Sequence, residues 1–80
     1  MSTFDYIERD RKIKEFESEI FSIPLYGEKV KEYYRIDFTG RFNENPVFGF
    51  KLGTILPSEI RQDCYDIFHK YFPNCDTSTL

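Results

Sequence analysis

The sequence predicts an α+β fold, a two-layer sandwich in which two helices pack on one face of a small antiparallel sheet. Three observations predict it: apolar residues recur at helical spacing near both ends of the chain, two segments between them alternate in polarity, and Gly, Asn and Pro separate these segments. Eighty residues allow one small domain, which we expect over residues 1–73 with a frayed tail at 74–80.

The first helix is expected from Asp5 to about Ser22, with Ser2 or Thr3 as its cap. Ile13, Phe16, Ile20 and Ile23 lie three or four residues apart and would form one buried face, while charged residues fill most other positions.

The segment that follows has two interpretations, because Pro24 ends the helix. The helix ends near Ser22 and extended chain continues to Tyr26, or residues 19–26 form an edge strand before the turn at Gly27. Helical periodicity favours the first interpretation, which makes the order of elements α-(β)-β-β-α.

Residues 30–39 and 47–52 are expected to be strands. In the first strand, Tyr34, Ile36 and Phe38 would face one side, and Tyr33, Arg35 and Asp37 the other. The connection at 40–46 is too short for a crossover helix, so the two strands should form an antiparallel hairpin.

The last helix is predicted from Pro57 to Tyr71, with Pro73 ending it. Its apolar residues follow the cleanest helical spacing in the chain. The helices and strands together predict one core: Ile13, Phe16, Ile20, Tyr34, Ile36, Phe38, Phe48, Phe50, Leu52, Ile60, Cys64, Ile67, Phe68 and Tyr71.

Composition argues against several classes of protein. Two cysteines do not make the disulfide framework of a small secreted domain, and no apolar run approaches the roughly 20 residues of a membrane span. The polar and charged start of the chain is unlike a secretory signal. We therefore expect a protein of the cytoplasm, or of a host cytoplasm, without membrane attachment.

The sequence carries no pattern typical of an enzyme, a metal site or a cofactor site. His69 is the only histidine, and its spacing from Cys64 and Cys75 matches no common metal motif. Asp63 and Asp66 fit solvated positions on a helix surface. We expect no catalytic activity, no metal and no cofactor.

An excess of aromatic residues, nine Phe and six Tyr, indicates a binding surface beyond the needs of the core. The expected contact residues lie on the outer face of the sheet, in the hairpin loop and on the first helix: Tyr33, Arg35, Asp37, Arg41, Phe42, Asn45, Glu15, Glu17 and Glu19. The hypothesis is a small non-enzymatic protein-binding module. It would act as a stoichiometric inhibitor, of the phage anti-defence or immunity-protein type, by steric occlusion of another protein.

A small nucleic-acid-binding domain is the alternative hypothesis. It would use sheet aromatics and the basic cluster of the first helix, Arg9, Arg11, Lys12 and Lys14. The net charge of −3 and the acids between these bases weaken the field that such a function needs. Pairing of two copies through an exposed sheet edge is a further expectation.

Overall fold

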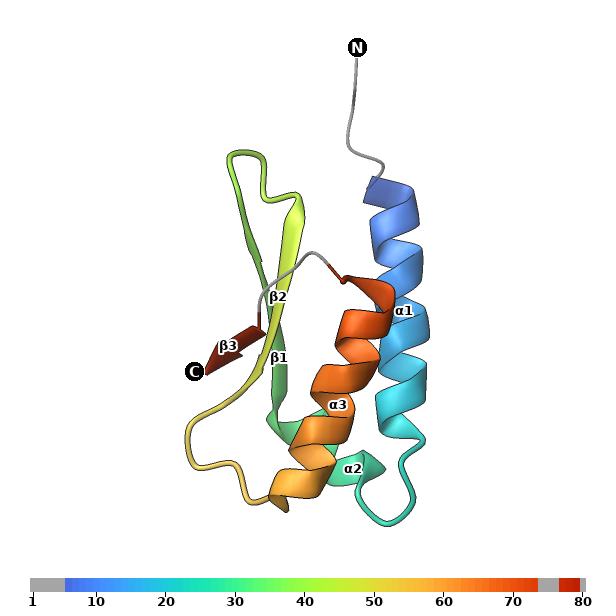
Figure 1. The fold of residues 1–80 in the computed structure, drawn as a ribbon, viewed down its shortest axis with the longest axis vertical. Helices are drawn as coiled ribbons and strands as arrows, with labels where there is room; N and C mark the ends of the chain where they lie inside the picture. Colours follow the sequence, from blue (N-terminus) through green and yellow to red (C-terminus); the bar gives the residue numbers. More distant parts are fainter. Residues whose placement is uncertain (1–5, 74–76, 80) are drawn as a thin grey trace.

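The computed structural model describes residues 6–73 and 77–79. Over these residues the chain forms three helices and three strands in an α+β arrangement, which confirms the predicted fold class (Figure 1). The elements are α1 (Tyr6–Phe21), α2 (Gly27–Tyr33), β1 (Tyr34–Thr39), β2 (Asn45–Phe50), α3 (Ser58–Tyr71) and β3 (Thr77–Thr79).

β1 and β2 form the expected antiparallel hairpin, in which Tyr34 pairs with Phe50 and Ile36 with Phe48. Directly opposed residues share a face, so these four side chains point to the same side of the sheet. Residues 77–79 lie parallel to β2 as β3, on the side away from β1. The expected frayed tail included residues 74–76 and 80, which lie outside the described residues, as do Ser2, Thr3 and Cys75.

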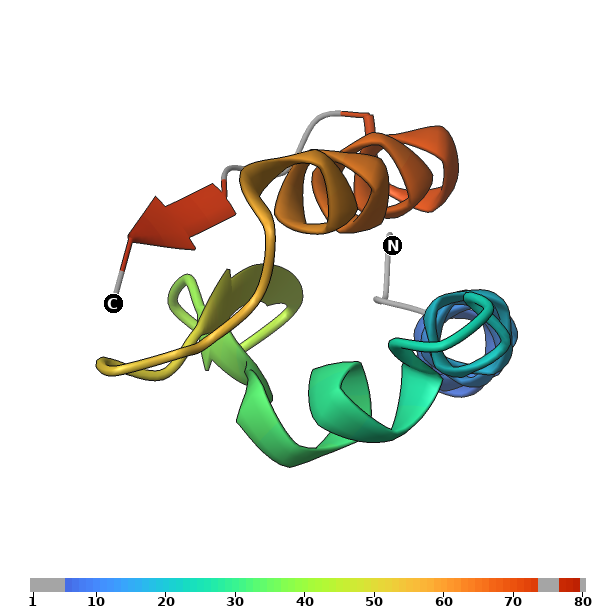
Figure 2. The same ribbon diagram turned by 90° about the horizontal axis from the view of Figure 1, so that it is seen from below.

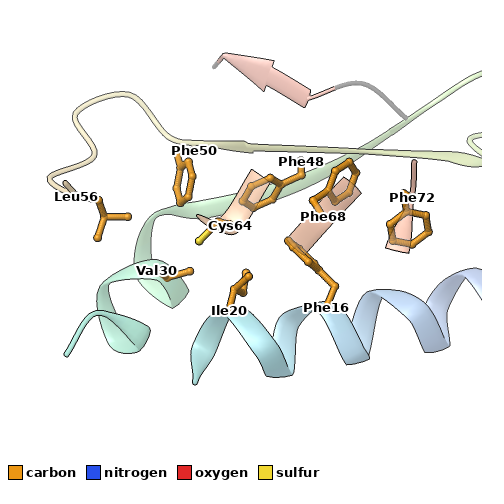
Figure 3. Close-up of a cluster of buried hydrophobic side chains, with 9 residues drawn as sticks. All are labelled: Phe16, Ile20, Val30, Phe48, Phe50, Leu56, Cys64, Phe68 and Phe72. Atoms are coloured by element: carbon orange, nitrogen blue, oxygen red, sulfur yellow. The ribbon is translucent and has the colours of Figure 1, made fainter. Parts of the chain in front are cut away.

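The two long helices cover the inner face of the sheet, which places the core between these two layers (Figure 2). Phe16 of α1 meets Phe48 of β2 and Phe68 of α3 with ring centroids 5.0 and 5.4 Å apart, in edge-to-face geometry. Figure 3 shows the nine buried apolar residues: Phe16, Ile20, Val30, Phe48, Phe50, Leu56, Cys64, Phe68 and Phe72. Six of them were expected from the sequence; Val30, Leu56 and Phe72 were not.

Two residues expected in the core are exposed. Leu52 is 86% exposed, because β2 ends at Phe50 and the chain then turns, with the Thr54 N–H donating to the Lys51 carbonyl at 3.3 Å. Phe38 is 38% exposed, since α3 ends short of the hairpin tip and leaves that end of the sheet uncovered (Figure 1).

The segment between α1 and β1 also differs from expectation. Residues 22–26 form turns, neither extended chain nor an edge strand, and residues 30–33 continue α2 where a strand was predicted. A Cβ on Gly27 would lie 2.0 Å from the Phe21 carbonyl oxygen, so only glycine allows α2 to start this close to the end of α1. The helix places Val30 fully in the core, and this burial outweighs the strand propensity of the local sequence.

Across the described part of the chain, no helix is both long enough and apolar enough to cross a bilayer.

Candidate protein-binding surface

The hairpin tip and the first turns of α1 lie together at one end of the molecule, beyond the end of α3 (Figure 1). We call this region, made of Tyr6, Arg9, Phe38 and residues 40–44, the tip surface. It holds three of the seven large apolar side chains that are exposed among the described residues. Exposed apolar groups gathered in one place are typical of a contact surface rather than of solvated helix.

The loop at the tip has a defined backbone conformation. Gly40 and Asn43 both have positive φ, 98° and 55°, and the Asn43 N–H donates to the Gly40 carbonyl at 3.2 Å. The Glu44 carboxylate accepts the Phe42 N–H at 2.9 Å. Glycine and asparagine tolerate this left-handed conformation best, so the sequence of the loop suits its shape.

Arg9 connects this loop to α1 through a hydrogen bond and two ring contacts. Its guanidinium donates to the Asn43 carbonyl at 2.8 Å and lies over the rings of Phe38 and Tyr6, 4.3 and 4.7 Å from their centroids. The arginine side chain is only 18% exposed, so these contacts are partly shielded from water. The guanidinium also forms an ion pair with Asp10, with 2.8 Å between Arg9 Nη2 and Asp10 Oδ1.

Tyr6 makes a second connection, because its hydroxyl donates to the Phe42 carbonyl at 2.8 Å. The main chain at Phe42 and Asn43 is thus held from α1 at two consecutive carbonyls. The Phe42 ring nevertheless remains 60% exposed, with the Arg41 guanidinium 5.8 Å from its centroid. An aromatic ring on a fixed backbone loses little conformational entropy on binding, which makes Phe42 suited to be the anchor of an interface.

Of the predicted contact residues, Arg41 and Phe42 therefore belong to the tip surface. Arg35 and Asp37 lie on the outer face of the sheet, as the alternation of the strand indicated. Asn45, expected in the loop, is instead the first residue of β2, where it pairs with Thr39 on the same face. Arg35 and Asp37 form an ion pair with a distance of 2.5 Å between Nη2 and Oδ2.

Tyr33 does not belong to the outer face, and its predicted position is wrong. It is the last residue of α2, half-buried and packed against the core. The alternation that placed it outside starts one residue later, at Tyr34.

The three predicted acids of α1 are engaged within the protein. Glu15 pairs with Arg11 at 2.7 Å, and Glu17 accepts the Tyr34 hydroxyl at 2.5 Å. Burial of the Tyr34 ring, together with this hydrogen bond, raises the pKa of Tyr34 to about 12. Glu15 and Glu17 thus have partners within the domain, and their contact with another protein stays a prediction.

Glu19 connects α1 to α3. Its carboxylate accepts hydrogen bonds from the Lys70 Nζ at 2.8 Å and from the Tyr71 hydroxyl. These two donors lower the pKa of Glu19, since they stabilise its charged form. Glu19 thus forms a hydrogen-bonded connection between α1 and α3 at the protein surface.

Sequence reasoning missed Tyr6, Arg9 and Phe38 as members of the tip surface. The available signal was the spacing of Tyr6 and Arg9, which continue the stripe of Ile13 and Phe16 toward the start of α1. A charged residue within an otherwise apolar stripe indicates that the stripe has left the core.

Three further features bear on the chemistry that the described residues can support. In the described ranges, no group of three or more His, Cys, Asp or Glu residues is placed to hold a metal ion. Burial raises the pKa of the Cys64 thiol to about 12, which suppresses the reactive thiolate. A hollow of about 220 Å³ lies between the 51–54 turn and α3, and another of about 360 Å³ lies on α1 beside Ile7, Asp10, Arg11 and Lys14.

Comparison of the chain with protein-family models, with curated proteins and with solved structures gives no match.

Proposed function

We propose that this protein is a non-enzymatic binding module that attaches to another protein through the tip surface and blocks the partner's active surface sterically. One observation carries the proposal: the Phe42 ring is 60% exposed although two side chains of α1 hold its backbone in place. An exposed aromatic side chain on a held backbone can be buried by a partner with little loss of conformational entropy, which is what an interface anchor requires.

The tip protrudes, so it fits a concave target. It lies past the end of α3, at one end of the described part of the molecule (Figure 1). A protruding loop with Arg41 beside Phe42 matches a pocket that is apolar at its base and acidic at its rim. Occupation of such a pocket is how a small inhibitor of the anti-defence or immunity-protein type would act, and we place this event in the cytoplasm.

Nucleic acid is a weaker candidate partner than protein. Arg9 is paired with Asp10, and Arg11 is paired with both Glu8 and Glu15 at the protein surface. Two of the four bases of the cluster are thereby matched by acids of the same helix, which reduces the attraction to phosphate. A gel shift at low salt tests this alternative, which requires binding that weakens steeply as salt is added.

Site-specific photo-crosslinking tests the protein-binding proposal. A photoreactive phenylalanine analogue replaces Phe42 in one variant and Ile55 in a control variant, since Ile55 is also exposed (70%) but belongs to the connection between β2 and α3. Cells of the source organism expressing either variant are irradiated and the adducts are identified. We expect one protein to crosslink from position 42 and not from position 55. Equal adducts at both positions, or none at position 42, would refute the tip surface as the binding site.

A further inference from the structure

β1 is the outer strand of the sheet, and one of its long sides has no neighbouring strand within the described part of the chain. The Lys51 N–H donates to the Tyr33 carbonyl at 2.9 Å. Hydrogen-bonded and non-hydrogen-bonded pairs alternate along an antiparallel ladder, so the odd-numbered residues of β1 exchange main-chain hydrogen bonds with β2. The main-chain groups of Tyr34, Ile36 and Phe38 therefore point away from β2.

One of these outward groups is already satisfied, because the Tyr34 N–H donates to the Val30 carbonyl at the end of α2. No hydrogen bond between described residues uses the main chain of Ile36 or Phe38 on this side. The hairpin pairs six consecutive residues of β1 without a bulge, and β1 contains no proline. Bulges and prolines are two of the features by which proteins prevent the addition of a further strand, and β1 has neither.

We propose that this edge binds β1 of a second copy of the chain in antiparallel orientation, with a two-fold axis at Ile36. In this register the Ile36 N–H of each copy donates to the partner's Ile36 carbonyl, and the Phe38 N–H of each copy donates to the partner's Tyr34 carbonyl. The N–H groups of Ile36 and Phe38 on this edge are then paired. Tyr34 of one copy lies opposite Phe38 of the other on the inner face, which covers the exposed part of the Phe38 ring.

The charged side chains on the outer face of β1 favour this register, and they favour a second copy of the chain as the partner. Arg35 and Asp37 stand two residues apart, so a two-fold axis at Ile36 places Arg35 of each copy opposite Asp37 of the other. The next register in one direction opposes Arg35 to Arg35, and the next in the other direction opposes Asp37 to Asp37. Like charges directly opposite each other destabilise both alternatives.

This self-complementarity is what an isologous interface requires, since each copy must present the same patch in the reverse direction. The charge pattern of the edge therefore matches a second copy of the chain, which is the occupant that we propose. The two hairpin tips would lie at opposite ends of the joined sheet, so the dimer would present two hairpin loops, each with Phe42 exposed.

Sedimentation velocity over a range of concentrations tests the proposal with charge reversals. In this register R35D places two carboxylates opposite each other at each cross-strand pair, and D37R places two guanidinium groups there. We expect either substitution to raise the dimer dissociation constant by about tenfold. The doubly exchanged R35D/D37R should dimerise like the unmodified chain. The control K14D makes the same charge change as R35D at an exposed position of α1 and should leave the dissociation constant unchanged.

Mixing R35D with D37R gives the sharpest readout, because the heterodimer brings each introduced carboxylate opposite an introduced guanidinium and retains one original pair of opposite charge. Native mass spectrometry should show the heterodimer in excess over both homodimers. A monomeric unmodified chain at about 1 mM would overturn the proposal, as would single reversals that leave dimerisation unchanged or a mixture that recovers no heterodimer. Circular dichroism verifies the folding of each variant, whose altered side chains lie on the outer face.

Discussion

Replacing Arg9 with leucine is the most informative perturbation of the tip surface. The change removes a charged hydrogen bond to the Asn43 carbonyl, worth about 1.5 kcal/mol or more, and two contacts with aromatic rings, worth about 0.5 kcal/mol each at a partly exposed position. The surface ion pair with Asp10 adds little. We expect the free energy of unfolding to fall by about 2.5 kcal/mol, which lowers the melting temperature of a domain of this size by about 10–20 °C.

Urea denaturation of R9L measures this loss, with K14L as the control because Lys14 is an exposed residue of the same helix. K14L should change the free energy of unfolding by less than about 0.5 kcal/mol. Amide hydrogen exchange localises the effect: in R9L the Asn43 amide, which donates to Gly40, should exchange faster relative to amides in the middle of α1. Equal stability of R9L and K14L, or unchanged exchange at Asn43, would refute the view that Arg9 fastens the hairpin tip.

Three further predictions concern the core, the contact of Glu19 with α3, and the hairpin loop. F16A removes a fully buried ring and should cost about 3–5 kcal/mol in urea denaturation; a cost below about 1 kcal/mol would contradict the central position of this ring. Because its pKa is lowered in the folded state, Glu19 stabilises the protein above the reference value of 4.5, and this stabilisation is lost as pH falls through the folded pKa. The difference in melting temperature between the unmodified chain and E19Q should therefore decrease as the pH is lowered. A difference that does not depend on pH would rule out stabilisation by the Glu19 carboxylate. G40A should destabilise more than G53A by thermal melting: both glycines have positive φ, but only at position 40 would a Cβ, 2.6 Å from the Glu44 carboxylate, displace this side chain from its hydrogen bond with the Phe42 N–H. Equal losses would mean that the packing of Glu44 in the loop is unimportant.

Most of the fold could be predicted from periodicity. The stripe of α1 and the stripe of α3 are regular enough to give both helices within two residues of their observed ends, and the Gly, Asn and Pro residues of the 40–46 segment indicate the hairpin. These signals are local, since each depends on residues a few positions apart.

The errors arise where tertiary packing decides. Val30 and Tyr33 have high strand propensity, yet Val30 reaches the core only because α2 folds back beside α1 at Gly27. Leu52 continues the alternation of β2 by its residue type, but the strand has already ended. No spacing in the sequence reports where the covering helix stops or where the chain turns.

The candidate site shows the same division. Phe42 could be predicted as exposed because it lies among Gly, Arg, Asn and Glu in a loop. Its fixation by Tyr6 and Arg9 depends on contacts across more than 30 residues of sequence, and the length of α1 relative to α3 determines them. The predicted acids of α1 also have partners within the fold, Arg11, Tyr34 and Lys70, which the sequence did not indicate, and their contact with another protein stays a prediction.

The affinity of the protein captured from position 42 for the unmodified chain and for F42A tests the central claim most directly. Isothermal titration should show a dissociation constant at least about tenfold weaker for F42A, as expected for a buried aromatic anchor, while the melting temperature of the free protein stays within about 2 °C. Equal affinities of the two chains would contradict the claim that a fixed, exposed Phe42 is the anchor of the interface.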